Sequence, residues 1–155
     1  MRMPTRRTPA VAAPRTCSIA RTLEVVGEKW ALLAVREVFL GDRRFEEMVR
    51  RTGAPRDTLA ARLRTLVGAG ILERRQYSDH PPRAEYFLTE SGLELYPVVL
   101  SLMRWGDRHR AGDQGPPLEL THNCGHVVDA QLVCRACQEE LLPGEVRRRV
   151  TVGAV

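Results

Sequence analysis

Two helical patterns meet at Gly53, and this junction constrains the fold more than any other feature of the sequence. The upstream pattern, RRFEEMVRRTG, is short and carries its apolar residues on one face. The downstream pattern runs from about Pro55 to Ala69, and its leucines form one apolar stripe opposite small and basic side chains. Because the turn between the patterns is only a few residues long, the two helices must lie in contact. The sequence therefore predicts a helix pair whose second member buries one side and presents a basic surface on the other.

A β-hairpin is predicted directly after this helix pair. The segments ILERRQY and AEYFLT have strand-like character, and they flank a tip that runs from Asp79 to Arg83. Pro81 and Pro82 have no backbone N–H to donate, so the tip should lie outside the sheet, stiff and extended. A short helix, a tight turn, an amphipathic helix and a hairpin together make a winged helix-turn-helix. The predicted fold class is therefore mainly α with a small β-hairpin.

Three further helical patterns complete the predicted domain, which spans residues 16–111. Residues 17–27 and 29–41 each end at a glycine, and the second of these patterns is apolar enough to be the central core helix. The last pattern, residues 89–109, holds more apolar surface than a small domain can cover, and a kink is expected at Pro97. We expect the surplus apolar surface to form a subunit interface.

The segments outside this domain differ from it in composition. Residues 1–15 are rich in proline, alanine and arginine and have no periodicity, which predicts a disordered basic tail. Residues 112–117 are a predicted linker, and residues 118–155 form a Cys/His-rich tail with the makings of a zinc ribbon-like unit. No apolar run approaches the roughly 18 residues of a membrane span, and the N-terminus lacks a secretory signal pattern. We expect a cytoplasmic protein without a membrane partner, whose cysteines stay reduced or bind metal.

Positive charge is concentrated around the predicted helix pair and hairpin. The chain has a formal net charge of +5, and residues 43–75 alone hold nine arginines against four acidic residues. Such a cluster suits a polyanion, and with the predicted helix-turn-helix we expect double-stranded DNA as the partner. On the second helix, arginines can donate two hydrogen bonds to a guanine and threonines can reach a base, while the other arginines suit phosphates. The predicted DNA-binding residues are Arg43, Arg44, Arg56, Thr58, Arg62, Arg64, Thr65, Arg74, His80 and Arg83.

Several linked strings within residues 17–109 resemble one known family. They are a cysteine followed by LEVVGEKW, then RFEEMVRRTGAPRDTLAARLRTLVGAGILERR, then HPPRAEYFLTESGLEL, and a late RWG. On these strings the chain is similar to the HxlR-type winged-helix transcription regulators, which are relatives of the MarR group. The resemblance implies homodimers whose first and last helices pack across the two-fold axis, and operator DNA with two half-sites. Repression is the more economical mode of control, since so small a domain has little surface for recruiting polymerase.

Cys17 lies next to the start of the first predicted helix, where the helix dipole favours a thiolate. Some HxlR-type regulators are similar in having a cysteine here that senses oxidants or electrophiles, although Ser18 stands where many relatives carry a proline. We therefore expect a thiol-reactive or oxidative signal at Cys17 to release the repressor from DNA. The alternative is that Cys17 is only a half-buried residue of the dimer contact.

The tail offers three further cysteines, in the strings HNCGH and CRAC. Cys134 and Cys137 have the C-x-x-C spacing of a zinc-binding turn, although Gln138 occupies the place where glycine usually eases that turn. HNCGH supplies two histidines and a cysteine at alternate positions. The alternative to a metal site is reduced thiols in a flexible tail. The predicted ligands of a structural Zn²⁺ are Cys124, His126, Cys134 and Cys137, with His122 as the alternative to His126.

Other hypotheses predict different partners. A small apolar ligand bound between the dimer helices, around Trp30, Tyr96, Met103 and Trp105, is an alternative signal to thiol oxidation. A winged-helix module that binds only protein would show no salt-dependent affinity for DNA. An enzyme is not expected, because the chain has no Gly-rich phosphate loop, H-E-x-x-H or G-x-S-x-G motif, and the H-x-E of zinc deaminases is missing.

Overall fold

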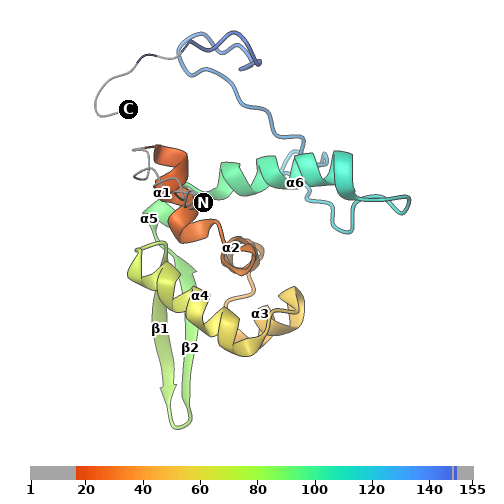
Figure 1. Ribbon diagram of the computed structural model, residues 1–155. Coiled ribbons are helices and arrows are strands. Elements are labelled where there is room, and N and C mark those ends of the chain that lie inside the picture. Colours follow the sequence, from red (N-terminus) through yellow and green to blue (C-terminus); the bar gives the residue numbers. More distant parts are fainter. Residues whose placement is uncertain (1–16, 148, 150–155) are drawn as a thin grey trace, which may run out of the picture.

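The computed structural model describes residues 17–147 and 149. The predicted basic tail, residues 1–15, lies outside the described residues. The chain is mainly α-helical with one antiparallel hairpin, which confirms the predicted fold class (Figure 1). In chain order the elements are α1 (Ser18–Val26), α2 (Lys29–Leu40), α3 (Phe45–Thr52), α4 (Arg56–Gly68), β1 (Leu72–Asp79), β2 (Pro82–Leu88), α5 (Glu90–Leu93) and α6 (Tyr96–Arg110).

Helix α2 is the centre of the core, as its nearly continuous apolar sequence predicts. Ala31, Ala34 and Val35 on this helix are completely buried. α2 contacts α1, α3, α4, α6 and β2, and in Figure 1 it is seen almost end-on at the middle of the molecule. It ends where Gly41 adopts a left-handed conformation with a φ of +98°, which glycine does without a steric penalty.

The turn around Gly53 joins α3 to α4 as predicted. Gly53 has a φ of +68°, and its N–H donates to the Val49 carbonyl, which closes α3. α4 then buries Leu59, Leu63 and Leu66 completely, so the predicted apolar stripe faces the core. Each leucine contributes roughly 1.5–3 kcal/mol when fully buried. This burial fixes the rotation of α4 and leaves its opposite face at the surface.

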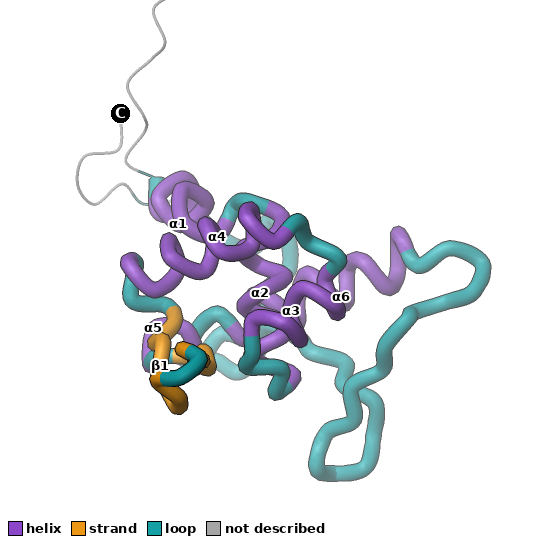
Figure 2. Tube along the Cα trace, turned by 90° about the horizontal axis from the view of Figure 1, so that it is seen from below, coloured by secondary structure: helices purple, strands orange, loops and turns teal. Residues whose placement is uncertain are grey.

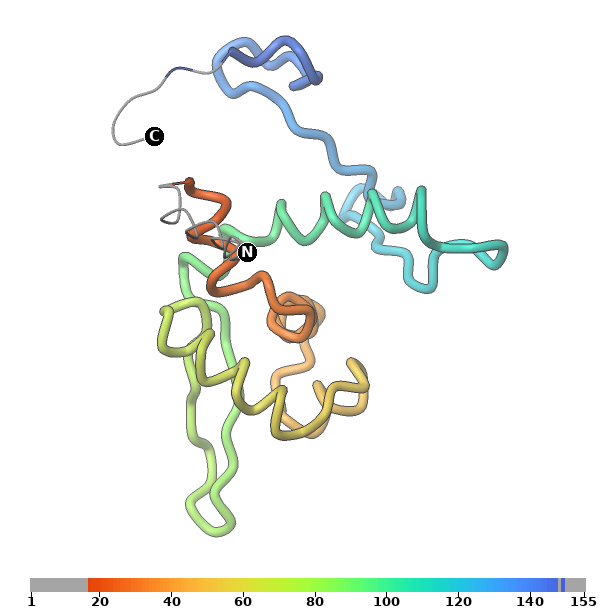
Figure 3. The backbone as a smooth tube through the Cα atoms, in the orientation of Figure 1, coloured from red at the N-terminus to blue at the C-terminus, as the bar shows by residue number. Residues whose placement is uncertain are grey.

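Strands β1 and β2 pair antiparallel and form the predicted wing. Only His80 and Pro81 lie between them, so the turn is shorter than the predicted tip, and Pro82 is already the first residue of β2. A proline is tolerated at the first position of a strand. The hairpin projects beyond the helices (Figure 3). The N–H of Tyr86 donates to the Arg43 carbonyl at 2.9 Å and ties the wing to the segment before α3.

The last predicted helix is two helices rather than one kinked helix. α5 ends at Leu93, and α6 begins at Tyr96 with Pro97 in its first turn. The predicted kink at Pro97 is therefore wrong, because a proline in the first turn has no helical N–H bond to lose. The break comes earlier, at Glu94 and Leu95, and Gly92 within α5 packs so closely on the Ile71 carbonyl that a Cβ atom would clash with it.

The described residues after α6, 111–147, form no further helix and no multi-residue strand. They run beside α6 and then away from it (Figure 1). Two tight turns interrupt this path, and each is closed by an isolated bridge, Thr121 with Val127 and Val133 with Glu140. The division of this part into a linker at 112–117 and a zinc ribbon-like unit at 118–155 remains a prediction.

Candidate DNA-binding surface

Helix α4 presents the outward face that the sequence predicts. Arg64 and Thr65 are exposed, and Thr58 and Ala61 are half-buried beside them. α4 has 13 residues, and a helix of that length is roughly 20 Å long. The major groove of B-DNA admits an α-helix, and its base edges accept hydrogen bonds from arginine and threonine side chains. The exposed face of α4 therefore has the size and the chemistry to enter a major groove.

A groove between α3 and the wing adjoins α4. Its volume is about 780 Å³, and we call it the arginine groove because Arg44, Arg50, Arg74 and Arg83 line it. In the view from below, the foreshortened hairpin lies at the lower left, with α4 above it and α3 to its right (Figure 2). Four arginines from the α3 region and from both strands thus line one surface, which also includes Glu46 and Glu47 of α3. Such a surface suits the phosphate backbone of a duplex whose major groove receives α4.

Two of the predicted DNA-binding arginines already have carboxylate partners within the chain. The Arg44 Nε donates to Glu85 at 2.9 Å, and this hydrogen bond raises the pKa of Arg44. Arg56 makes two hydrogen bonds with the carboxylate of Glu46, one of 2.7 Å, and they raise the pKa of Arg56 and lower the pKa of Glu46. DNA must therefore compete with these carboxylates for both arginines.

Phe87 holds two further arginines at the base of the wing. The guanidinium carbons of Arg43 and Arg75 lie 4.6 Å and 4.4 Å from the centre of its ring. Arg75 also donates to Glu73 at 2.8 Å, and this bond raises the pKa of Arg75. The sequence analysis missed Phe87, because its role depends on the strand register, in which it lies directly opposite Glu73. Arg43 is thus placed against an aromatic ring rather than pointing freely into solvent.

The remaining predicted residues differ in their exposure and in whether the chain gives them a polar partner. In the part of the chain that the structure describes, Arg64, Arg74 and Arg83 have no carboxylate within ion-pair distance. His80 is exposed at the tip of the wing. Arg62 differs, because it is half-buried and its Nε has no hydrogen-bond partner among the described residues. The arginines most available to DNA are therefore one on α4 and two in the arginine groove.

The substitution Glu46→Gln is expected to strengthen DNA binding about two- to fivefold. The charged Glu46 carboxylate pairs with Arg56, so DNA must displace this carboxylate before it can bind the guanidinium. Glutamine keeps the size of the side chain and removes the charge. Fluorescence anisotropy titrations at fixed salt measure the change, with Glu94→Gln, an exposed acid at the end of α5, as the matched control. Unchanged or weaker binding by Glu46→Gln would show that Arg56 does not contact DNA.

Apolar side chains are uncovered on the two helices predicted to form the dimer. On α1, Ile19 and Leu23 have exposed fractions of 70% and 53%. On α6, Leu102 and Trp105 have exposed fractions of 51% and 55%. Cys17 is the N-cap residue of α1 and is exposed, next to the first helix as predicted. Uncovered apolar surface of this kind is typical of a protein–protein contact.

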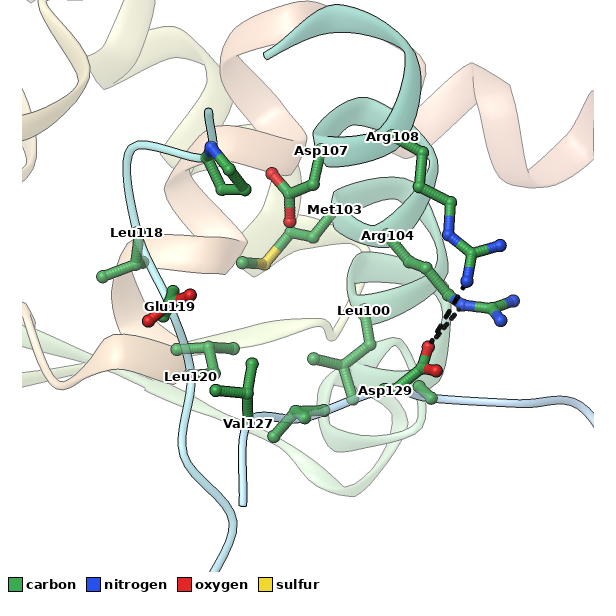
Figure 4. Close-up of a pocket in the computed structure, with 13 residues that line it drawn as sticks. Leu100, Met103, Arg104, Asp107, Arg108, Leu118, Glu119, Leu120, Val127 and Asp129 are labelled. Carbon is green, nitrogen blue, oxygen red and sulfur yellow. Dashed lines mark hydrogen bonds and ion pairs between the residues drawn. The ribbon is translucent and has the colours of Figure 1, made fainter. Parts of the chain in front are cut away.

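The four residues predicted to surround a small apolar ligand contact different parts of the structure. Tyr96 packs on Phe39 with ring centroids 4.8 Å apart, and Trp30 packs against the core. Met103 lines a cavity of about 220 Å³ between α6 and the tail (Figure 4). Trp105 is exposed on α6. The described part of a single chain therefore does not gather these four residues around one cavity.

The tail brings its candidate metal ligands together in pairs. The Nδ1 of His122 lies 3.2 Å from the Sγ of Cys124. In the second turn, hydrogen bonds from the backbone N–H groups of Cys137 and Ala136, together with the Cys137 side chain, lower the pKa of the Cys134 thiol. Among the described residues, no three His, Cys, Asp or Glu side chains converge as a metal-binding group. The predicted zinc site is therefore not confirmed.

No helix in the described part of the chain is long and apolar enough to cross a membrane. The α3–turn–α4 unit and its hairpin place the protein in the class of winged helix-turn-helix proteins. Within that class, the chain belongs to the HxlR-like helix-turn-helix family, which matches residues 25–114. This membership makes the protein a transcription regulator rather than an enzyme.

Individual relatives agree with this assignment. The HTH-type transcriptional regulator Rv3095 of Mycobacterium tuberculosis is 47% identical over 125 residues, which cover 80% of this chain and 79% of that protein. Among solved structures, the transcription factor PA1607 has a TM-score of 0.76 at 29% identity, over 86% of this chain and 94% of that one. The redox regulator HypR, solved in its oxidised form, has a TM-score of 0.56 at 37% identity, over 61% of this chain and 98% of that one.

Proposed function

We propose that the protein is a homodimeric repressor that binds operator DNA in a sequence-specific manner. The observation that carries this proposal is the exposed face of α4 beside the arginine groove. α4 enters the major groove, where Arg64 and Thr65 reach base edges. The arginine groove binds phosphates, and the wing tip with His80 lies over the DNA backbone or the adjacent minor groove.

Homodimerisation is supported by the exposed apolar side chains of α1 and α6. A two-fold axis that brings these helices of two chains together covers both surfaces at once. It also places two α4 helices roughly 34 Å apart, the length of one helical turn of DNA. A dimer bound in this way occupies two successive major grooves on one side of the duplex. Occupying a promoter in this way is sufficient for repression.

Hydroxyl-radical footprinting on the DNA upstream of the protein's own gene tests this arrangement. We expect two protected half-sites with centres about 10 base pairs apart, on one face of the duplex. Sedimentation equilibrium of the same preparation should give a dimer. A single protected half-site together with a monomer in solution would contradict the dimeric arrangement.

The signal proposed for this repressor is oxidation of Cys17. Its place at the N-terminus of α1, on the surface proposed for the dimer, allows a change at the sulfur to alter the spacing of the two α4 helices. The similarity to HypR, a redox regulator by its title, supports this choice. A small apolar ligand at the dimer interface is the competing signal.

Diamide treatment is expected to lower the operator affinity of the wild-type protein about 5- to 150-fold, the usual range of an allosteric coupling. The variant Cys17→Ser is expected to keep its affinity, because it lacks the sulfur proposed to be oxidised. Its three tail cysteines are unchanged, so the comparison isolates Cys17. Anisotropy titrations before and after oxidation make the comparison. Equal losses in both proteins would move the signal to the tail, and no loss in either would favour the small-ligand hypothesis.

We also propose a cellular compartment and a metal cofactor for the protein. The protein acts in the cytoplasm, where its thiols are kept reduced until a signal arrives. Its one proposed cofactor is a structural zinc ion in the C-terminal segment. A winged-helix module that binds only protein is the remaining alternative, and it predicts no salt-dependent affinity for DNA.

A further inference from the structure

A cavity of about 220 Å³ lies between α6 and residues 116–130 of the tail (Figure 4). Two runs of the tail form its outer wall, and they are tied together because the N–H of Val128 donates to the Leu120 carbonyl at 2.7 Å. This wall is also held on α6, because the Arg104 Nε donates to Asp129 at 2.7 Å. The cavity is therefore already formed within one chain, and no element has to move to create it.

The facing walls of this cavity carry apolar side chains. Leu100 and Met103 of α6 form one wall. Leu118, Leu120 and Val127 of the tail form the other (Figure 4). An apolar cavity of about 150 Å³ is large enough to bind benzene, and pockets for drug-sized ligands begin at about 300 Å³. The volume of this cavity lies between these two values, so the cavity suits a ligand with one six-membered ring and a short side arm.

The charged side chains around the cavity leave one carboxylate unpaired beside its apolar walls. Arg104 and Arg108 both contact Asp129, at 2.7 Å and 3.9 Å, and their guanidinium groups extend away from the apolar walls (Figure 4). Asp107 is half-buried beside Met103, and it has no ion-pair partner among the residues that the structure describes. A partly desolvated carboxylate without a partner favours a cation. An anion is disfavoured, because both arginines are already bound to a carboxylate.

We propose that this cavity binds a small primary amine that carries one apolar ring. The ring packs between the α6 wall and the tail wall, in contact with Met103. The ammonium group donates a charge-assisted hydrogen bond to the Asp107 carboxylate. Glu119 lines the same cavity and adds to its attraction for a cation.

This site is separate from the surface proposed for the dimer. Ile19, Leu23, Leu102 and Trp105, the exposed apolar residues of that surface, do not line the cavity. The amine therefore occupies a different place from the competing ligand at the dimer interface, and one chain supplies its whole site. Because the ligand contacts both α6 and the tail, it stabilises the packing of the tail on α6.

Benzylamine, benzyl alcohol and benzoate test the proposal, because they share one ring and differ in charge. NMR of the full chain, isotope-labelled at its methionine methyl groups, detects the ring through the shift of a methyl signal that it contacts. Met103 lines the cavity, and Met48, completely buried in the core, is the internal reference. Benzylamine should shift the Met103 signal saturably, leave the Met48 signal in place and bind roughly tenfold more tightly than benzyl alcohol. No saturable shift with any probe, equal shifts at both methionines, or binding of either other probe as tight as that of benzylamine would overturn the proposal.

The variant Asp107→Asn tests the charge at the cavity, because asparagine keeps the size of the side chain. It should weaken benzylamine binding roughly tenfold and leave benzyl alcohol binding unchanged. Asp113→Asn, the same change at an exposed position outside the cavity, is the matched control and should alter neither. Unchanged benzylamine binding by Asp107→Asn would overturn the assignment of this carboxylate. The probe comparison on the wild-type protein decides the ligand class even where a variant does not fold, and it uses no DNA, so its failure leaves the DNA-binding proposal untouched.

Discussion

Arg64→Ala is expected to weaken binding to the operator about 5- to 150-fold, the range of a good base contact. Arg64 is exposed on the outward face of α4, and the structure gives it no carboxylate partner among the described residues. Its guanidinium is therefore available to make two hydrogen bonds to a guanine. A scrambled duplex offers no such arrangement, so binding to scrambled DNA should weaken much less. Anisotropy titrations on both duplexes at the same salt concentration give the two ratios.

Arg147→Ala is the matched control for this experiment, because it removes the same charge from an exposed position in the tail. We expect it to lower both affinities slightly and equally. Equal losses on both duplexes for Arg64→Ala as well would mean that Arg64 binds phosphate rather than a base. In that case, the base contacts of α4 would fall to Thr58 and Thr65.

Leu63→Ala is expected to lower the free energy of unfolding by about 2–5 kcal/mol, the usual cost of truncating a buried leucine. Leu63 is completely buried on the inner side of α4, and α4 packs on α2. Truncation leaves a cavity under the helix that we propose to enter DNA. Because a small domain has a total stability of only about 5–15 kcal/mol, this loss should be visible at once. Urea unfolding at one fixed protein concentration measures it, since a dimer's stability depends on concentration.

Leu132→Ala serves as the control for burial, because this leucine is 58% exposed in the tail. Its truncation should change the free energy of unfolding by less than about 0.5 kcal/mol, as for most surface substitutions. If Leu63→Ala also cost less than about 1 kcal/mol, the site would not be the packed core position that its burial indicates.

The helix-turn-helix and the wing were predictable because their signals are local. Gly41 ends α2 and Gly53 ends α3, each in a left-handed conformation. Glycine adopts this conformation readily, so the two helix ends can be predicted from the glycines in the sequence. The leucine stripe of α4 follows from a period of 3.6 residues, and the wing follows from two strand-like runs around adjacent prolines. Each of these signals lies within one short continuous stretch of the chain, and so the sequence alone places the elements.

The features that the sequence did not reveal depend on contacts between distant residues. The close packing of Gly92, in α5, on the Ile71 carbonyl joins two residues that are 21 positions apart in the chain. The pairing of Arg56 with Glu46 requires the turn between α3 and α4 to have one particular shape. The position of Arg56 in the sequence predicts a DNA contact. It cannot show that the Glu46 carboxylate already binds this arginine.

The tail illustrates the same limit at its candidate metal ligands. The strings HNCGH and CRAC indicate two turns, and the structure contains both. Spacing alone left His122 and His126 equivalent, because both lie two positions from Cys124. In the structure, the His122 ring contacts the Cys124 sulfur, and Gly125 next to it adopts a left-handed conformation.

The central claim, sequence-specific DNA binding, is tested most directly by comparing the reduced protein's affinity for its own upstream intergenic DNA with its affinity for a scrambled duplex. At physiological salt we expect the upstream fragment to be bound about a thousandfold more tightly, or better. Equal and weak binding to both duplexes that disappears as salt is raised would contradict the claim, and would leave a basic winged helix with no operator of its own.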